Sequence, residues 1–249
     1  MKKILMLIIV LVLPLIVFAK DFEIKDIDLK IKLKDDYIVF TRDNISNNED
    51  LSKLNIKEDY MKEVMDNNNI YLDILNNDVS YEILVVVPNK TLSFYDLSSA
   101  TDSMLDDLKN ELMKKTGSEK ASIYKNNHNY IIVDYYDKNT DNYIVNYYTV
   151  VNAKGYNFQL QKKNEITDTE KQELKEIIDS VNITVKESDN KNTGFSIKNI
   201  IIGAIIGAIV GLISYIISNY LKKNNNDNKK VKKSGNKKKK LEIEDDIKK

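Results

Sequence analysis

Two long uncharged runs stand near the ends of the chain, and between them apolar residues recur at short, regular intervals. The first run covers residues 4–18 and follows Lys2 and Lys3. A basic start, an apolar stretch and short side chains before a cut site are the features of a secretory signal peptide. We therefore expect residues 1–19 to be a signal peptide that is cleaved after Ala19. The alternative is an uncleaved anchor helix, although this run is short for a membrane span.

The second run covers residues 200–221 and contains no charged side chain. A helix of that length crosses the roughly 30 Å hydrocarbon core of a bilayer. Lysines follow the run at once and are sparse before it, so the positive-inside rule places the C-terminus in the cytoplasm and residues 20–186 outside the cell membrane. The lysines that we assign to this topology anchor, or to contact with anionic lipid, are Lys222, Lys223, Lys229, Lys230, Lys232 and Lys233.

Residues 20–186 alternate between strand-like and helix-like patterns. Apolar residues stand at every second position from Ile27 to Leu33, which is typical of a half-buried strand. The same reasoning predicts strands at 27–33, 37–41, 70–75, 81–87, 121–125, 129–137, 143–152 and 156–162, and helices at 57–66, 97–116 and from Thr167 to Val181. Residues 187–199 are expected to be a polar linker, and residues 222–249 a basic, disordered tail.

Several boundaries are set by residues with known capping or turn preferences. Thr167 and Glu170 form a capping box, in which each side chain accepts a hydrogen bond from the other residue's free backbone N–H. Gly117 can end the helix predicted at 97–116. Short connections at 139–142 and 152–155 join the late strands, so these strands run antiparallel. We therefore predict an α+β fold in which helices pack on a mostly antiparallel sheet.

One segment resembles a known family. It runs from Tyr147 to Val181 and reads YYTVVNAKGYNFQLQKKNEITDTEKQELKEIIDSV. A strand, a short Asn/Gly turn, a Tyr/Phe-rich strand and a closing helix that ends near Asp-Ser make it similar to the C-terminal half of PsbP-like α/β/α sandwich domains. The layout of signal, domain and helix also resembles membrane-anchored proteins of low-GC Gram-positive bacteria. The resemblance implies a binding or assembly module within residues 21–185 and names no ligand.

The amino-acid composition excludes several classes of functional site. The chain has 249 residues, one His and no Cys, which excludes disulfides, zinc–thiolate sites, iron–sulfur clusters and thiol nucleophiles. The formal net charge is zero, but acidic residues prevail in 20–196 and lysines in 222–249. Separate parts of the chain therefore face separate environments. We expect no cofactor, no bound metal and no enzyme activity.

Three features imitate catalytic or metal sites. The segment 137–142 carries oxygen-bearing side chains like the start of an EF-hand loop. Asn142 stands where such a loop needs Gly, and Tyr148 where it needs Glu, so a polar hairpin turn is favoured over weak calcium binding. His128 has the chemistry of a general base but lies in a predicted turn with no Ser or Asp motif around it. Acidic pairs such as Asp106-Asp107 leave glycosidase-like chemistry open.

Tyrosines are concentrated on the late strands, at positions 130, 135, 136, 143, 147, 148 and 156. Exposed aromatic side chains on a sheet can bind sugars or a partner protein. Tyrosine is also an ordinary strand residue whose ring packs half-buried, and both interpretations stay open. Under the first, the ligand surface consists of Tyr136, Tyr143 and Tyr148.

Gly203, Gly207 and Gly211 lie on one face of the predicted membrane helix. Small residues at every fourth position let two helices approach closely, so this face predicts self-association or a partner helix.

The preferred function is a single-pass, non-catalytic binding or scaffolding protein at the cell surface. The alternatives are a structural subunit assembled through the glycine face and, less favoured, an extracytoplasmic hydrolase. We expect membrane lipid and a protein as partners, and no nucleic acid, because the tail lacks aromatic residues for base stacking.

Overall fold

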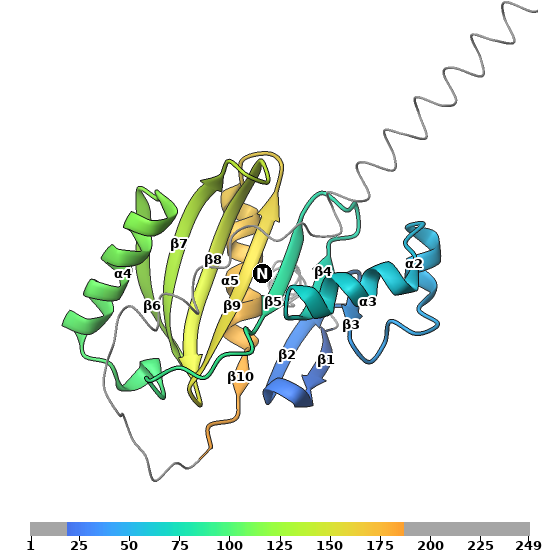
Figure 1. The fold of residues 1–249 in the computed structure, drawn as a ribbon. Coiled ribbons are helices and arrows are strands. Elements are labelled where there is room, and N and C mark those ends of the chain that lie inside the picture. The colour runs from blue at the N-terminus through green and yellow to red at the C-terminus, as the bar shows by residue number, and fades with distance from the viewer. Residues whose placement is uncertain (1–18, 187–249) are drawn as a thin grey trace, which may run out of the picture.

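The computed structural model describes residues 19–186, which form two antiparallel sheets with helices packed on them (Figure 1). Along the chain the elements are β1 (Ala19–Ile24), η1 (Lys25–Ile27), β2 (Leu29–Lys34), β3 (Ile38–Thr41), α2 (Glu49–Lys53), α3 (Glu58–Asn67), β4 (Ile70–Leu75), β5 (Glu82–Val86), η2 (Leu97–Ser99), α4 (Asp102–Thr116), β6 (Lys120–Lys125), β7 (Asn129–Asp137), β8 (Asn142–Val151), β9 (Lys154–Lys162), α5 (Asp168–Ser180) and β10 (Asn182–Ile183).

The membrane-related predictions concern residues outside this range. They are the linker 187–199, the membrane helix 200–221 with its glycine face, the lysine-rich tail 222–249, and the signal peptide predicted at 1–19, of which only Ala19, the first residue of β1, is described. Within residues 19–186, no helix combines the length and the apolar character that a bilayer span needs.

The larger sheet contains seven strands in the order β3-β4-β5-β9-β8-β7-β6, and each neighbouring pair is antiparallel. All seven were predicted, and their ends differ from the prediction by two residues at most. β6 and β3 are the edges of this sheet, and β9 is at its centre. The mostly antiparallel α+β fold is therefore confirmed.

The smaller sheet contains three strands in the order β1-β2-β10, again antiparallel. The pattern of β2 is as predicted, since Leu29, Ile31 and Leu33 are buried and the lysines between them are exposed or half-buried. Its two neighbours, β1 and β10, were not predicted. The sequence pattern of β1 is weak because its apolar positions are few, and β10 is only two residues long.

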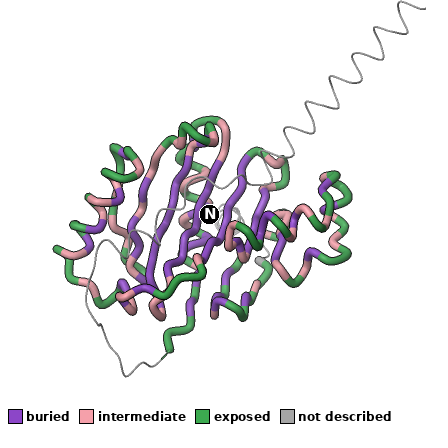
Figure 2. The backbone as a smooth tube through the Cα atoms, in the orientation of Figure 1, coloured by how far each residue is buried: buried purple, intermediate pink, exposed green. Residues whose placement is uncertain are grey.

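The elements form layers on the two faces of the larger sheet, and its strands are largely buried (Figure 2). One face packs against α5 and the smaller sheet, through a core that includes Phe158, Leu160, Leu174 and Ile178. The other face carries two separate clusters. One lies under α2 and α3, and the other lies under α4 and the segment that leads into it.

The helices α2, α4 and α5 each start at a residue whose side chain caps the helix. Thr167 and Glu170 form the predicted capping box at the start of α5. Gly117 ends α4 with a φ of 69°, as predicted. The helix predicted at 97–116 is interrupted, because the hydroxyl of Thr101 accepts the backbone N–H of Met104 and starts α4 there. The short helix α2, capped by Asn48, was not predicted.

The β8–β9 hairpin turn needs an unusual backbone conformation. Asn152 and Ala153 form a two-residue turn with φ values of 53° and 58°. Positive φ at both positions is typical of the hairpin turn that matches strand twist. Asn tolerates this conformation, but the Cβ of Ala153 makes it unfavourable there. The turn is also held from outside, because Leu92 donates its N–H to the carbonyl of Ala153.

Candidate functional site

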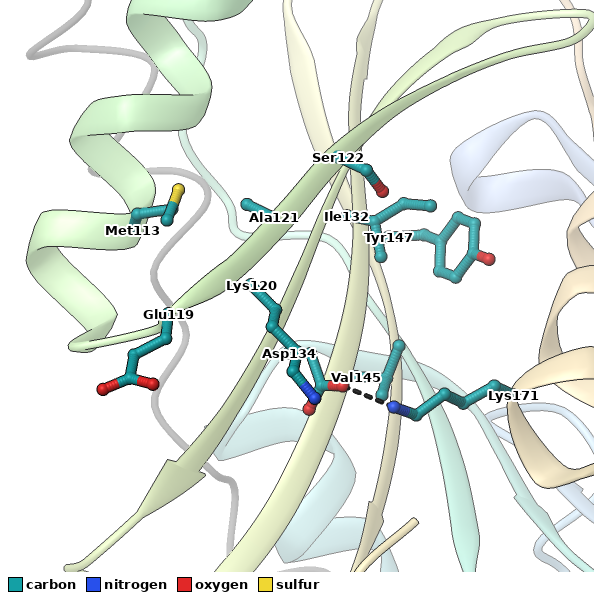
Figure 3. Close-up of a pocket in the computed structure, with 10 residues that line it drawn as sticks. All are labelled: Met113, Glu119, Lys120, Ala121, Ser122, Ile132, Asp134, Val145, Tyr147 and Lys171. Atoms are coloured by element: carbon teal, nitrogen blue, oxygen red, sulfur yellow. Dashed lines mark hydrogen bonds and ion pairs between the residues drawn. The ribbon is translucent and has the colours of Figure 1, made fainter. Parts of the chain in front are cut away.

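A hollow runs beside β6, the edge strand of the larger sheet (Figure 3). Its cavity volume is about 380 Å³. The residues that line it are Met113, Glu119, Lys120, Ala121, Ser122, Ile132, Asp134, Val145, Tyr147 and Lys171. We call this space the edge hollow.

The edge hollow reaches both faces of the sheet. Met113 comes from α4 and lies on one side of β6, whereas Tyr147 and Lys171 lie on the other side (Figure 3). Ala121 packs with the cluster under α4. Ile132, two positions before Asp134 on β7, packs with the core on the α5 face. Among residues 19–186, β6 therefore has a neighbouring strand on one side only, and side chains flank its other edge on both faces of the sheet.

An ion pair closes the α5 side of this hollow. The Nζ of Lys171 lies 2.5 Å from Oδ2 of Asp134, and both side chains are about one-third exposed. Lys120 is the register partner of Asp134 on the neighbouring strand. One lysine is therefore bonded to this carboxylate, and a second lysine stands at the opposite position of the neighbouring strand. This pair was not predicted, because its members are 37 residues apart in sequence and no local pattern connects them.

A second hollow of about 280 Å³ continues from the first and shares Glu119, Lys120, Asp134 and Lys171 with it. Its walls include Tyr136 and Tyr143, two of the three tyrosines predicted to form a ligand surface. They are register partners on β7 and β8, with ring centroids 5.0 Å apart.

Tyr136 is the more accessible of these two rings. Its side chain is 41% exposed, and its hydroxyl lies 2.5 Å from Oδ1 of Asp141. This hydrogen bond to a carboxylate raises the pKa of Tyr136. The ring is therefore held at the surface with its proton in place, available for contact with a ligand.

Tyr148 does not belong to this surface, and its inclusion was wrong. Its side chain is 0% exposed and packs in the cluster under α4. Tyr143 and Tyr148 are five positions apart on one strand, and side chains an odd number of positions apart point to opposite faces. Tyr130, Tyr147 and Tyr156 are also buried. Packing within the core therefore accounts for most of the tyrosines on the late strands, in agreement with the interpretation of tyrosine as an ordinary strand residue.

Two solved structures resemble the fold. One is cyanobacterial PsbP (CyanoP) from Synechocystis, with 14% identity, a TM-score of 0.38 and coverage of 68% of this chain and 94% of that one. The other is a protein from Bacteroides thetaiotaomicron, with 12% identity, a TM-score of 0.39 and coverage of 67% of this chain and 48% of that one. The first is a PsbP, which is the family that residues 147–181 resemble. At such TM-scores the likeness carries no information about ligand or partner. No family model and no curated protein matches the sequence.

The other predicted chemical features have structural roles. Residues 137–142 close the β7–β8 hairpin, and the Asp137 carboxylate accepts hydrogen bonds from the backbone of Asn139 and the hydroxyl of Thr140. His128 lies in the β6–β7 connection, is 5% exposed and packs edge-on against Tyr130, and burial lowers its pKa. Asp106 and Asp107 are exposed on α4. Within residues 19–186, no cluster of three or more His, Asp or Glu side chains is arranged to hold a metal ion.

A third hollow of about 450 Å³ lies where the smaller sheet meets α5. Glu173 is at its centre and accepts hydrogen bonds from Tyr81 and, over 3.0 Å, from Lys34. Tyr37 extends this network, with its hydroxyl 3.2 Å from that of Tyr81. Burial and these contacts raise the pKa of Tyr81 far above its ordinary value. The polar groups here bond to one another, and they join β2 to α5.

Proposed function

We propose that this protein is a non-catalytic binding or scaffolding protein, anchored by a single membrane helix, whose domain lies outside the cell and binds an extended segment of a partner protein along β6. The observation that supports the proposal is the edge hollow, which follows a sheet edge that is unpaired within the described domain and reaches both faces of the sheet. In strand addition, main-chain hydrogen bonds give affinity, and pockets on the two faces receive alternate side chains.

An edge strand such as β6 offers the backbone hydrogen-bonding groups that strand addition needs. An edge strand directs about half of its backbone N–H and C=O groups away from the sheet, where a new strand can pair with them. On one face a partner side chain would meet Met113 and Ala121. On the other face it would meet Tyr147 and the Asp134–Lys171 ion pair.

Charge favours a different protein over a second copy of this chain. β6 begins with Lys120 and ends with Lys125, and both are exposed. Antiparallel pairing of two β6 strands would set Lys120 of one copy opposite Lys125 of the other, and like charges directly opposite each other are destabilising. The layers of the domain and the pattern of residues 147–181 further support a PsbP-like α/β/α sandwich as the fold of this binding module.

Hydrogen exchange tests strand addition directly. In native membranes that contain the partner, alternate backbone amides of β6 should exchange more slowly than in the purified full-length chain. The other edge strand, β3, is the internal control and should not change. If β6 and β3 behave alike in both samples, the edge is not the docking site.

Site-directed crosslinking provides an independent check, because the native chain has no Cys. Ser122→Cys places a thiol in the edge hollow, and Ser103→Cys places one on the exposed start of α4. A short thiol-reactive crosslinker should give an adduct at position 122 that is absent at position 103. Equal crosslinking at both positions would contradict a specific site.

A further inference from the structure

The two sides of β6 differ in chemistry along the edge hollow. Ala121 and Ile123 pack with the cluster under α4, and because side chains alternate along a strand, the odd-numbered positions of β6 face α4. Lys120 faces the other way, since it stands opposite Asp134, whose carboxylate is bonded to Lys171 of α5. A strand added beside β6 would therefore meet different groups on its α4 side and on its α5 side.

The α4 side combines an apolar surface with one carboxylate. Met113 and Ala121 line it, and Glu119, the residue before β6, extends its carboxylate on the same side of the strand (Figure 3). Glu119 is exposed, and within residues 19–186 its side chain has no bonding partner. Such a surface fits lysine or arginine, because the aliphatic part of the side chain packs on apolar atoms while the charged end reaches a carboxylate.

The α5 side carries one uncompensated positive charge. Lys171 neutralises Asp134, with 2.5 Å between Nζ and Oδ2. Lys120 is exposed, and its ammonium group has no bonding partner in the described part of the chain. Glu165 lines the second hollow and not this one. An aspartate or glutamate of a partner would compensate Lys120 through a charge-assisted hydrogen bond.

Strand geometry fixes the order of the partner residues. Neighbouring residues of a strand point to opposite faces, so one partner residue stands beside Glu119 on the α4 side and the next stands beside Lys120 on the α5 side. The residue after that returns to the α4 side and meets Ala121 and Met113. The order is therefore basic, acidic, apolar, read in one chain direction for antiparallel pairing and in the other for parallel pairing.

We propose that β6 selects a partner strand that carries a basic and an acidic residue at adjacent positions, followed by an apolar residue. This inference rests on the function proposed above, because it names the chemistry of the segment that strand addition would bring to β6. Acidic residues outnumber basic ones in the domain as a whole, so net charge alone would favour any basic segment. The edge of β6 instead requires both signs, one on each side of the added strand.

Exchanging the two charges tests this requirement. Glu119→Lys combined with Lys120→Glu reverses the sign on each side and leaves the net charge of the chain unchanged. Both favourable contacts become contacts between like charges, so capture of the partner should fall about tenfold.

The matched control exchanges two adjacent charges elsewhere. Lys25→Asp combined with Asp26→Lys acts on exposed residues of η1 that line none of the three hollows. Because solvent-exposed charges far from the contact contribute little, this exchange should change the capture by less than about twofold.

The capture is measured with Ser122→Cys, which places a thiol in the edge hollow. A photoactivatable, thiol-specific crosslinker is attached to this cysteine in the full-length chain in native membranes, and the yield of adduct is compared between the variants. Mass spectrometry of the crosslinked peptide then reads the partner segment. It should contain a basic, an acidic and an apolar residue in that order, in either chain direction.

The outcomes separate this inference from strand addition itself. If Ser122→Cys captures a partner and Ser103→Cys does not, but the charge exchange leaves the yield unchanged, the inference is overturned and strand addition stands. A crosslinked peptide without adjacent opposite charges has the same meaning. If position 122 captures no more than position 103, both are overturned.

A folding defect is checked by far-ultraviolet circular dichroism. If the exchanged variant does not fold, Glu119→Gln and Lys120→Gln replace it, because each removes one charge and introduces no repulsion. Each should lower the yield of adduct, and an unchanged yield in both folded variants would overturn the inference.

Discussion

The hydroxyl of Tyr156 donates a hydrogen bond of 2.9 Å to the backbone carbonyl of Ile27, which is 129 residues earlier in the chain. Tyr156 belongs to β9, the central strand of the larger sheet, and Ile27 belongs to η1, between the first two strands of the smaller sheet. Both side chains are buried. Burial also raises the pKa of Tyr156, so the hydroxyl keeps its proton and remains a donor. The two sheets are thus joined by a specific bond as well as by apolar packing.

Removing the hydroxyl of Tyr156 should destabilise the domain. Tyr156→Phe leaves the buried carbonyl of Ile27 without this donor, which costs about 1–3 kcal/mol. The matched control is Tyr130→Phe. Tyr130 is equally buried, but its hydroxyl has no hydrogen-bonding partner among the described residues, so its removal should stabilise by about 1 kcal/mol.

Urea unfolding followed by far-ultraviolet circular dichroism measures both free energies of unfolding, and the chain has no Trp to serve as a fluorescence probe. The two substitutions delete the same atom, so their opposite signs isolate the hydrogen bond. If both variants shift the urea midpoint of unfolding in the same direction, the Tyr156–Ile27 hydrogen bond does not contribute the stability assigned to it.

Ala153→Gly should stabilise the domain. Ala153 has a φ of 58° in the β8–β9 turn, where a Cβ is unfavourable and glycine is not. After the cost of glycine in the unfolded chain, we expect a gain of about 0.5–1 kcal/mol. Ala100→Gly, at a position with a φ of −73°, is the control and should destabilise. Thermal unfolding of both variants decides between these outcomes, and a loss of stability in Ala153→Gly would contradict the strained turn.

The stability of the domain should decrease as the pH rises above the ordinary range of a carboxyl. Burial, and then the neighbouring Glu82 carboxyl, raise the pKa of Asp73 well above its ordinary value of 3.8. Between that value and the raised pKa, the folded state holds a proton that the unfolded chain releases. The free energy of unfolding therefore falls with increasing pH. Asp73→Asn removes this titration, so its profile should be flatter than that of the wild type over the same range. Identical profiles would show that Asp73 does not titrate in this way.

The orientation across the membrane can be tested with single cysteines. Ser103 is exposed on α4, and Ser234 lies in the predicted cytoplasmic tail. In intact cells a membrane-impermeant maleimide should label Ser103→Cys and not Ser234→Cys. The opposite labelling would place the domain in the cytoplasm and would remove the proposed extracellular partner. Permeabilised cells, in which both positions should react, are the control.

Patterns within a short window of sequence, such as apolar alternation and helix capping, predicted most of the elements correctly. The alternation from Ile27 to Leu33 and the capping box at Thr167 and Glu170 both correspond to observed structure. β1 and β10 were missed because their stability comes from pairing with β2, and β10 joins β2 from about 150 residues away. Such pairing leaves no trace in a short window of sequence.

The candidate site was only partly accessible to sequence reasoning. Tyr136 and Tyr143 were found because tyrosines mark the late strands, but Tyr148 should have been set aside, since strand alternation already places it on the opposite face from Tyr143. The Asp134–Lys171 pair depends on how α5 packs against β7. Asp73 did have a signal, because it interrupts a strand whose other side chains are all apolar or aromatic.

The smaller sheet holds both ends of the described domain. β1 carries the first described residues, and β10 pairs with the same neighbour through two residues before the chain leaves at Lys186. There Lys186 forms an ion pair of 2.6 Å with Asp28. If residues 187–199 tether the domain to a membrane helix, a pull from a partner held at β6 reaches the domain first at Lys186, whose backbone is bonded to Asn152 and Tyr95. These contacts would have to break before the load reached the two-residue strand β10, so they act as a mechanical clamp on the end of the domain.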